Sequence, residues 1–294
     1  MARRARVPAF AKINLTLEVL WKRETGFHDI ATVFQTIDLC DWLEISVREG
    51  EGTFVSSNID IPGKNIAETA AERVLAALGR RARVDIYIEK RIPLGGGLGG
   101  SSTDGSAVLL ALPRLLDSAV GFDFLDPIAA SLGSDVNFLM RGGTAAAFGR
   151  GDATWEVPGM GSFCGKLFAP GFAVGAGEAY GALGRPGVTS FLQEEQLAAR
   201  RRFETLVRRM ESLPVGEWAG ECRNDFEDFV FSKYPELARK REEMSVGADL
   251  ARMSGSGSSL FALYAREIPD ADFRTLSREE FAARWEKALN VTLS

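Results

Sequence analysis

Histidine is almost absent from the sequence: the 294 residues include one, His28. This scarcity excludes zinc motifs built on histidine pairs and leaves one candidate for any step that needs an imidazole. The cysteines, Cys40, Cys164 and Cys222, are far apart and form no Cys-x-x-Cys pair. They indicate neither a disulfide framework nor a zinc site, so we expect reduced thiols that lie mostly in the core.

The chain also lacks an excess of basic residues and a long hydrophobic run. Lys and Arg number 35 against 40 Asp and Glu, a formal charge of −5, which argues against a nucleic-acid-binding protein. No apolar run approaches the roughly 18 residues of a membrane span. The basic N-terminus has the charge of the start of a signal peptide. A signal peptide then needs an apolar segment, and Lys12, Asn14 and Glu18 lie where that segment would be. We therefore expect a cytoplasmic protein that binds neither nucleic acid nor membranes.

Alternating apolar and polar residues predict a strand from Ala11 to Leu20. On this strand Lys12 and Asn14 project side by side from the polar face. The next segment is polar, contains Gly26 and His28, and is predicted to be a turn into a second strand.

The rest of the chain alternates between short apolar strands and amphipathic helices, with Asn65 as a plausible helix cap. The pattern predicts strands at 30–37, 43–47, 84–88, 166–174 and 260–264, helices at 67–78, 107–112, 126–133 and 196–212, and an extended segment at 136–140.

Glycine is concentrated in one loop, Gly95-Gly-Gly-Leu-Gly-Gly100, between a predicted strand and a predicted helix. A tight turn explains one or two glycines but not five. Glycine lets backbone N–H groups approach an anion closely, and the N-terminus of the following helix adds partial positive charge. The loop therefore predicts a phosphate-binding site.

Three classes of phosphate-binding protein carry such loops. No Lys follows the loop as a Walker motif requires, so P-loop NTPases are excluded. Gly95, Gly97 and Gly100 fit the fingerprint of a Rossmann-type NAD(P) or flavin oxidoreductase, but no apolar strand precedes Asp117 or Asp123, the acidic residues in range. The third class is a kinase that holds nucleotide phosphates in a long Gly/Ser loop. The oxidoreductase remains the alternative from another class.

Five motifs occur in the order and spacing of the GHMP kinases. They are Pro8-Ala-Phe-Ala-Lys-Ile-Asn14, Gly26-Phe-His28, Pro93-Leu-Gly-Gly-Gly-Leu-Gly-Gly-Ser-Ser102, Gly133-Ser-Asp-Val136 and Met253-Ser-Gly-Ser-Gly257. With the segment Asn224-Asp-Phe-Glu227, the chain most resembles the branch of this family that phosphorylates diphosphocytidyl methylerythritol in the non-mevalonate isoprenoid pathway.

The resemblance implies an α+β, two-lobed fold with the active site in the cleft between the lobes. The N-terminal lobe would span residues 1–158 and the C-terminal lobe residues 159–294. ATP and Mg²⁺ would be the cofactors, with metal ligands unassigned, and the protein would be a monomer or homodimer.

The resemblance also assigns roles to individual residues. Asp135 would be the catalytic aspartate that receives or orients the proton of the acceptor hydroxyl, and Lys12 would keep it ionised and counter the phosphoryl charge. The expected ATP-binding residues are Pro93, Gly95, Gly96, Gly97, Leu98, Gly99, Gly100, Ser101, Ser102 and Thr103, with Asn65 near the nucleotide or acting only as a helix cap.

The substrate-binding residues implied by the family are Asn14, Phe27, His28, Tyr180, Ser254 and Gly255. Phe27 and Tyr180 would sandwich the cytosine base and His28 would hydrogen-bond to it. The sequence departs from the family pattern at Phe27, Ser101, Asn137 and Ala176. These departures leave open a GHMP kinase for another small alcohol, of the mevalonate or homoserine type, or a non-catalytic nucleotide-binding relative.

Overall fold

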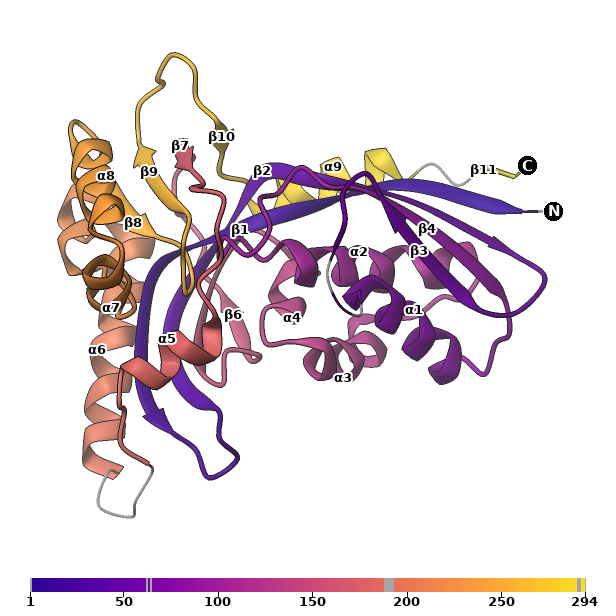
Figure 1. Cartoon of the computed structure of the whole chain (residues 1–294), viewed down its shortest axis with the longest axis horizontal. Helices are drawn as coiled ribbons and strands as arrows, with labels where there is room; N and C mark the ends of the chain where they lie inside the picture. The colour runs from indigo at the N-terminus through magenta and orange to yellow at the C-terminus, as the bar shows by residue number, and fades with distance from the viewer. Residues whose placement is uncertain (1, 62, 64, 188–192, 290–291, 294) are drawn as a thin grey trace.

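The computed structural model describes residues 2–61, 63, 65–187, 193–289 and 292–293. Two long antiparallel strands, β1 (Arg3–Lys22) and β2 (His28–Arg48), run through the molecule and connect its two parts (Figure 1).

Within the described residues, the first sheet has the order β11-β1-β2-β4-β3, with β5 on β2 and β6 on β5. Its remaining strands are β3 (Thr53–Ser57), β4 (Arg83–Glu89), β5 (Thr144–Gly149), β6 (Thr154–Glu156) and β11 (Thr292–Leu293). The second sheet has the order β10-β7-β9-β8 and consists of β7 (Cys164–Phe168), β8 (Leu250–Met253), β9 (Leu260–Tyr264) and β10 (Phe273–Arg274).

The helices pack against these sheets. They are α1 (Ile66–Ala77), α2 (Gly100–Leu115), α3 (Phe122–Leu132), α4 (Val136–Leu139), α5 (Ala176–Ala182), α6 (Gln193–Ser212), α7 (Glu227–Lys233), α8 (Pro235–Ser245) and α9 (Arg278–Ala288), with 3₁₀ turns at Val215–Glu217 and Ala219–Glu221. No helix of the described residues is long and apolar enough to cross a membrane.

Strand β2 replaces the two strands predicted at 30–37 and 43–47. One edge of β2 pairs with β1 along most of the strand. The opposite edge pairs first with β5 and then with β4. The sequence predicted two strands because the charged residues Asp38 and Asp41 interrupt the run of apolar positions between them. Asp41 stays inside the strand because its buried carboxylate contacts the ammonium group of Lys90.

The first core lies under the N-terminal part of the sheet, where α1, α2 and α3 cover one face (Figure 1). Helix α9 returns to this core: Phe281 and Trp285 are buried in it, and the rings of Phe10 and Phe281 are 5.6 Å apart. The division at residue 158 stays a prediction, and α9 packs with the elements that precede it.

The second core joins the other end of β1 and β2 to the second sheet and α6. Phe203, Val207 and Met210, the apolar stripe of the predicted helix at 196–212, are buried there against Phe261 and Leu263. The amphipathic pattern therefore identified both the helix and its buried face.

Three local predictions were wrong. Residues 136–139 form helix α4 instead of an extended segment, because a short apolar run does not distinguish helix from strand. Helix α2 begins at Gly100 and continues through Pro113 to Leu115, so it extends beyond the predicted bounds at both ends. Helix α3 begins at Phe122, ahead of the predicted start at residue 126, so Asp126 lies inside it; the Asp126 carboxylate accepts a hydrogen bond from Arg141 at 2.8 Å.

Candidate active site

The first feature of the candidate site is Lys12, a buried ammonium group on β1. Irregularities in the pairing of β1 with β2 lie on both sides of it, between Phe10 and Lys12 and between Asn14 and Thr16. Such bulges redirect side chains, often beside active sites. Lys12 is 3% exposed, and its Nζ donates to Asn14 Oδ1 at 2.6 Å and to the carbonyl of Gly97 at 2.8 Å. The predicted side-by-side placement of Lys12 and Asn14 is confirmed.

Asp135 stands opposite this lysine. Its Oδ2 lies 3.6 Å from Lys12 Nζ, and 28% of its side chain remains exposed, so a ligand could reach the carboxylate. Asp135 follows Gly133, which ends α3, and precedes α4. Burial lowers the pKa of Lys12 below its usual value, while the adjacent Asp135 carboxylate opposes that shift and favours the charged ammonium.

The glycine loop leads into the N-terminus of α2. Gly99, which has no side chain to cap the helix, precedes it with a φ of 76°, so the first backbone N–H groups are left for another acceptor. Ser101 and Ser102 lie in the first turn. A Cβ on Gly133 would lie 3.7 Å from Ser102 Oγ, so this hydroxyl faces the segment that carries Asp135.

Other predicted loop residues face inward. Leu98 is buried and its carbonyl accepts from the backbone N–H of Lys12 at 3.0 Å. The Thr103 hydroxyl donates to the carbonyl of Phe10 at 2.8 Å and is also buried. The structure therefore does not bring the Thr103 hydroxyl to the surface of the loop.

Asn65 caps α1. Its Oδ1 accepts from the backbone N–H of Ala67 at 2.9 Å, as the cap prediction required. It also borders a cavity of about 630 Å³ that is lined by β3, the segment after it and Glu68. Asn65 is thus both a cap and a cavity residue.

A second glycine loop, residues 254–259, packs directly on the first. Ser254 Oγ donates to the carbonyl of Gly97 at 2.9 Å, and the backbone N–H of Ser259 donates to the carbonyl of Gly96 at 3.2 Å. A Cβ on Gly97 would lie 2.0 Å from the carbonyl oxygen of Ser254. Gly97 is therefore required by the close approach of two backbones.

The second loop is braced by Asn14 and by Asn224. Asn14 Oδ1 accepts from the backbone N–H of Gly255 at 3.0 Å. Asn224 Nδ2 donates to the carbonyls of Met253 and Gly255 at 2.7 and 2.8 Å, and Glu227 accepts from the N–H of Met253 at 2.8 Å. These contacts give the segment Asn224–Glu227 a structural role that its sequence alone did not define.

An aromatic group lies at the turn between β1 and β2. The rings of His28 and Tyr180 stack at 4.8 Å with an interplanar angle of 19°, and Tyr180 meets Phe226 edge-on at 4.9 Å. Phe27 is 56% exposed, with the Arg150 guanidinium 5.1 Å from its ring centre. The structure thus brings His28 and Tyr180 together, although they are far apart in the sequence.

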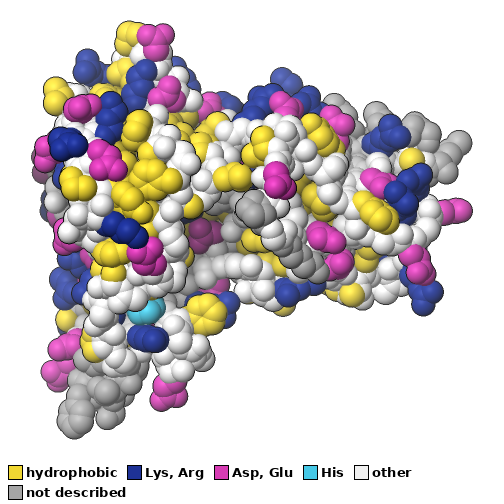
Figure 2. Space-filling view, in the orientation of Figure 1, with side chains coloured by type: hydrophobic (Ala, Val, Ile, Leu, Met, Phe, Trp, Pro, Cys, Tyr) yellow, Lys and Arg dark blue, Asp and Glu magenta, His cyan; other side chains and the backbone are white. Residues whose placement is uncertain are grey.

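The electrostatics of this group favour a neutral imidazole. Burial and the nearby charges of Lys22 and Arg185 lower the pKa of His28. Burial, together with the charge of Asp135, raises the pKa of Tyr180 to about 12. In the space-filling view the surface is hollowed between the two parts of the molecule, and the histidine is visible at the surface (Figure 2).

The departures from the family pattern have different surroundings. Asn137 is buried, and its Nδ2 donates to the carbonyl of Asp152 at 3.4 Å. Ala176 is the first residue of α5, the helix that carries Tyr180, and is exposed.

Sequence reasoning missed a buried cluster of Lys90, Asp41 and Asp104. Lys90 Nζ contacts Asp41 and lies 2.8 Å from Asp104 Oδ2. Lys90 and Asp104 carry opposite charges and flank the glycine loop at nearly equal distances along the chain, so the sequence could have indicated that these two residues form a pair. Nothing in the sequence paired either residue with Asp41.

Comparisons with known proteins agree with this geometry. Residues 65–150 match the GHMP kinases N terminal domain, and residues 197–284 match the GHMP kinases C terminal domain. The 4-diphosphocytidyl-2-C-methyl-D-erythritol kinase of Solibacter usitatus is 38% identical, with 98% of this chain and 94% of the relative covered. The enzyme of the same name from Syntrophomonas wolfei is 35% identical, with 98% and 97% covered.

A solved structure shows the same relationship. The crystal structure of a 4-(cytidine 5'-diphospho)-2C-methyl-D-erythritol kinase is 30% identical, covers 98% of this chain and 97% of its own, and has a TM-score of 0.68. The predicted two-lobed fold is confirmed, and the Rossmann alternative is excluded because the glycine loop follows a strand of a largely antiparallel sheet. The chain belongs to the GHMP kinase family.

Proposed function

We propose that this chain transfers the γ-phosphoryl group of ATP to a hydroxyl of 4-diphosphocytidyl-2-C-methyl-D-erythritol. The observation that carries the proposal is the pairing of buried Lys12 with the accessible carboxylate of Asp135, 3.6 Å away, beside the glycine loop. The relatives named for this substrate cover nearly the whole chain, and their similarity supports the choice of substrate.

In the proposed reaction the acceptor oxygen bonds to the γ-phosphorus while the bond to the oxygen that bridges the β- and γ-phosphates breaks. ADP leaves with that oxygen, and Asp135 takes the proton of the acceptor hydroxyl. Phosphoryl transfer requires mainly positioning and charge stabilisation. Lys12 suits this role because Asn14, Gly97 and Asp135 hold its ammonium group in one place.

The glycine loop and the start of α2 would bind the triphosphate through backbone N–H groups and the helix dipole. The Ser102 hydroxyl, which faces the segment that carries Asp135, fits a Mg²⁺ ion, because Mg²⁺ commonly takes few protein oxygens and several phosphate oxygens. In the described part of the chain no group of three or more acidic, histidine or cysteine side chains could hold a metal ion. A bound Mg²⁺ would neutralise phosphate charge.

The aromatic group would bind the cytosine end of the substrate. In this structure His28 covers one face of the Tyr180 ring, and the Phe27 ring is exposed and free to stack on the base. Because its low pKa keeps His28 neutral, one ring nitrogen can donate and the other can accept a hydrogen bond from the base. Base recognition would therefore combine stacking with one directional contact.

The test is an ATP-dependent phosphorylation assay on a panel of three alcohols: 4-diphosphocytidyl-2-C-methyl-D-erythritol, mevalonate and homoserine. We expect ADP release and a phosphorylated product with the cytidyl compound only. Turnover of mevalonate or homoserine without turnover of the cytidyl compound would reject the proposed substrate and leave the kinase family intact.

A further inference from the structure

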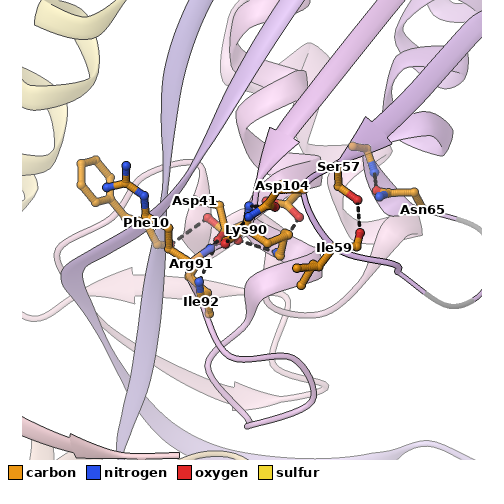
Figure 3. A network of polar contacts seen from close by, with 12 residues as sticks. Phe10, Asp41, Ser57, Ile59, Asn65, Lys90, Arg91, Ile92 and Asp104 are labelled. Carbon is orange, nitrogen blue, oxygen red and sulfur yellow. Dashed lines mark hydrogen bonds and ion pairs between the residues drawn. The ribbon is translucent and has the colours of Figure 1, made fainter. Parts of the chain in front are cut away.

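A buried charge cluster lies beside the glycine loop, outside the proposed reacting groups. Lys90 follows β4, Asp41 lies in β2 and Asp104 lies in α2, and the three residues are 6%, 0% and 1% exposed. Figure 3 shows the Lys90 side chain between the two carboxylates. Its Nζ contacts Asp41 Oδ2 and lies 2.8 Å from Asp104 Oδ2.

The cluster holds both ends of the loop. The second carboxylate oxygen of Asp41 accepts from the backbone N–H groups of Arg91 and Ile92 at 2.6 and 2.8 Å, and these residues begin the loop. Asp104 lies near the start of α2, the helix that ends the loop. The ammonium group of Lys90 therefore ties the entry of the loop to the helix at its exit.

Gly100 provides an independent sign that the loop is fitted around this ammonium group. A Cβ at Gly100 would lie 3.4 Å from Lys90 Nζ and 3.2 Å from Ile92 Cγ2. The latter contact is tighter than most Cβ contacts, so a side chain at Gly100 would displace Ile92, at the loop entry, by a few tenths of an ångström. The lack of a side chain at Gly100 therefore leaves room for Lys90 and Ile92, in addition to letting an anion approach the backbone.

We propose that Lys90, Asp41 and Asp104 are positioning residues that set the glycine loop for nucleotide binding. By fixing the separation between the loop entry and α2, they place the backbone N–H groups that would face the triphosphate. The inference rests on the proposed role of the loop in ATP binding. None of the three residues is required to touch the nucleotide.

The surroundings of Asp104 come from three elements. Lys90 from the end of β4 and Asp41 from β2 face Asp104, while α1 presents the apolar Ile66 beside Gly105. The Oδ1 atom of Asp104 has no hydrogen-bond partner among the described residues. Burial, with the charge of Asp41 adding and that of Lys90 opposing, raises the pKa of Asp104 to about 7. A change at Asp104 that shifts the loop should weaken nucleotide binding and leave the binding of the cytidyl substrate intact, so the readout of a positioning role is a separation of the two KM values.

Two variants of nearly equal size separate positioning from packing. Asp104→Asn keeps an oxygen that can accept from Lys90, whereas Asp104→Leu removes it. Ser106→Ala is the matched control, because it deletes a buried hydrogen bond to the Thr103 carbonyl in the same helix without touching the cluster. The ADP dissociation constant is measured by calorimetry at a single pH, and KM is measured for both substrates.

We expect Asp104→Leu to weaken ADP binding and raise KM for ATP about tenfold, because a buried ammonium loses one of its partners. KM for the cytidyl substrate should stay unchanged, and Asp104→Asn should bind ADP nearly as the wild type does. Ser106→Ala should change thermal stability only.

The positioning role is overturned if Asp104→Leu binds ADP as tightly as the wild type, or if KM rises equally for both substrates. Should Asp104→Leu fail to fold, Asp41→Asn decides. Its amide has one oxygen where the carboxylate has two, so it loses either Lys90 or the two N–H groups at the loop entry, and ADP binding as tight as in the wild type rejects the role. Failure of the wild-type chain to bind ADP would instead overturn the proposed nucleotide function of the loop, and the positioning role with it.

Discussion

Gly97 is the point where the two glycine loops touch, so its replacement by alanine tests whether their contact matters. Its φ is +76°, and an added Cβ would lie 2.0 Å from the carbonyl oxygen and 2.8 Å from the carbonyl carbon of Ser254. Both are backbone atoms, which cannot rotate away as a side chain could. Gly97→Ala must therefore separate the loops.

The cost follows from the contacts that separation breaks. The left-handed conformation costs an alanine about 1–2 kcal/mol. The Gly97 carbonyl also accepts from Lys12 and Ser254, and losing a charged and a neutral hydrogen bond costs about 1.5–3 and 0.5–1.5 kcal/mol. A total of about 3–6.5 kcal/mol, shared between stability and catalysis, predicts a fall in kcat/KM of at least about a hundredfold.

Gly79→Ala is the matched control, because Gly79 has a φ of +61° and an added Cβ meets no described atom within 4 Å. It should lower the free energy of unfolding in urea by about 1–2 kcal/mol and leave the kinetic constants unchanged. Steady-state kinetics and urea denaturation of both variants check the reasoning. Equal kinetic constants for Gly97→Ala and Gly79→Ala would refute it.

Three further predictions concern the base site, the second loop and the buried cluster. His28→Ala should raise KM for the cytidyl substrate about tenfold and leave KM for ATP unchanged, because it removes a stacking ring and a hydrogen bond. Tyr180→Phe, which keeps its ring, should have the kinetic constants of the wild type. Equal changes in both KM values of His28→Ala would contradict the prediction. Asn224→Ala should lower the free energy of unfolding, measured by urea denaturation, by about 2 kcal/mol, because the carbonyls of Met253 and Gly255 lose their donor. An unchanged free energy would show that Asn224 does not stabilise the second glycine loop. The raised pKa of Asp104 means that the folded state binds more protons than the unfolded state between about pH 4 and 7, so the wild-type free energy of unfolding should fall as pH rises through that range. Urea titrations at several pH values should show that Asp104→Asn removes this fall, and an identical slope in both proteins would refute it.

The sequence predicted the elements whose patterns are local. The strand with Lys12 and Asn14 on one face, the helix capped by Asn65 and the buried stripe of α6 all depend on neighbours a few residues apart. The boundaries were weaker: α2 is longer than its apolar run because Ser101 to Ser106 form helical turns despite their small or polar side chains.

The parts of the candidate site that the sequence did not reveal depend on contacts between distant segments. Asp41 broke a strand pattern because its partner, Lys90, is 49 residues away. The contact between Gly97 and Ser254 spans 157 residues, and the stack of His28 on Tyr180 joins a hairpin to a helix. Residue patterns identify which groups can act, whereas the fold decides which of them meet.

The pairing of Lys12 with Asp135 is the centre of the proposed mechanism, and Asp135→Asn tests it most directly. The variant keeps the shape of the side chain but removes the charge and the site for the proton. At saturating ATP and cytidyl substrate, kcat should fall by about 10²–10⁴, the contribution of a general base, while the dissociation constant of ADP stays unchanged. A kcat near the wild-type value would contradict the assignment of Asp135 as the proton acceptor.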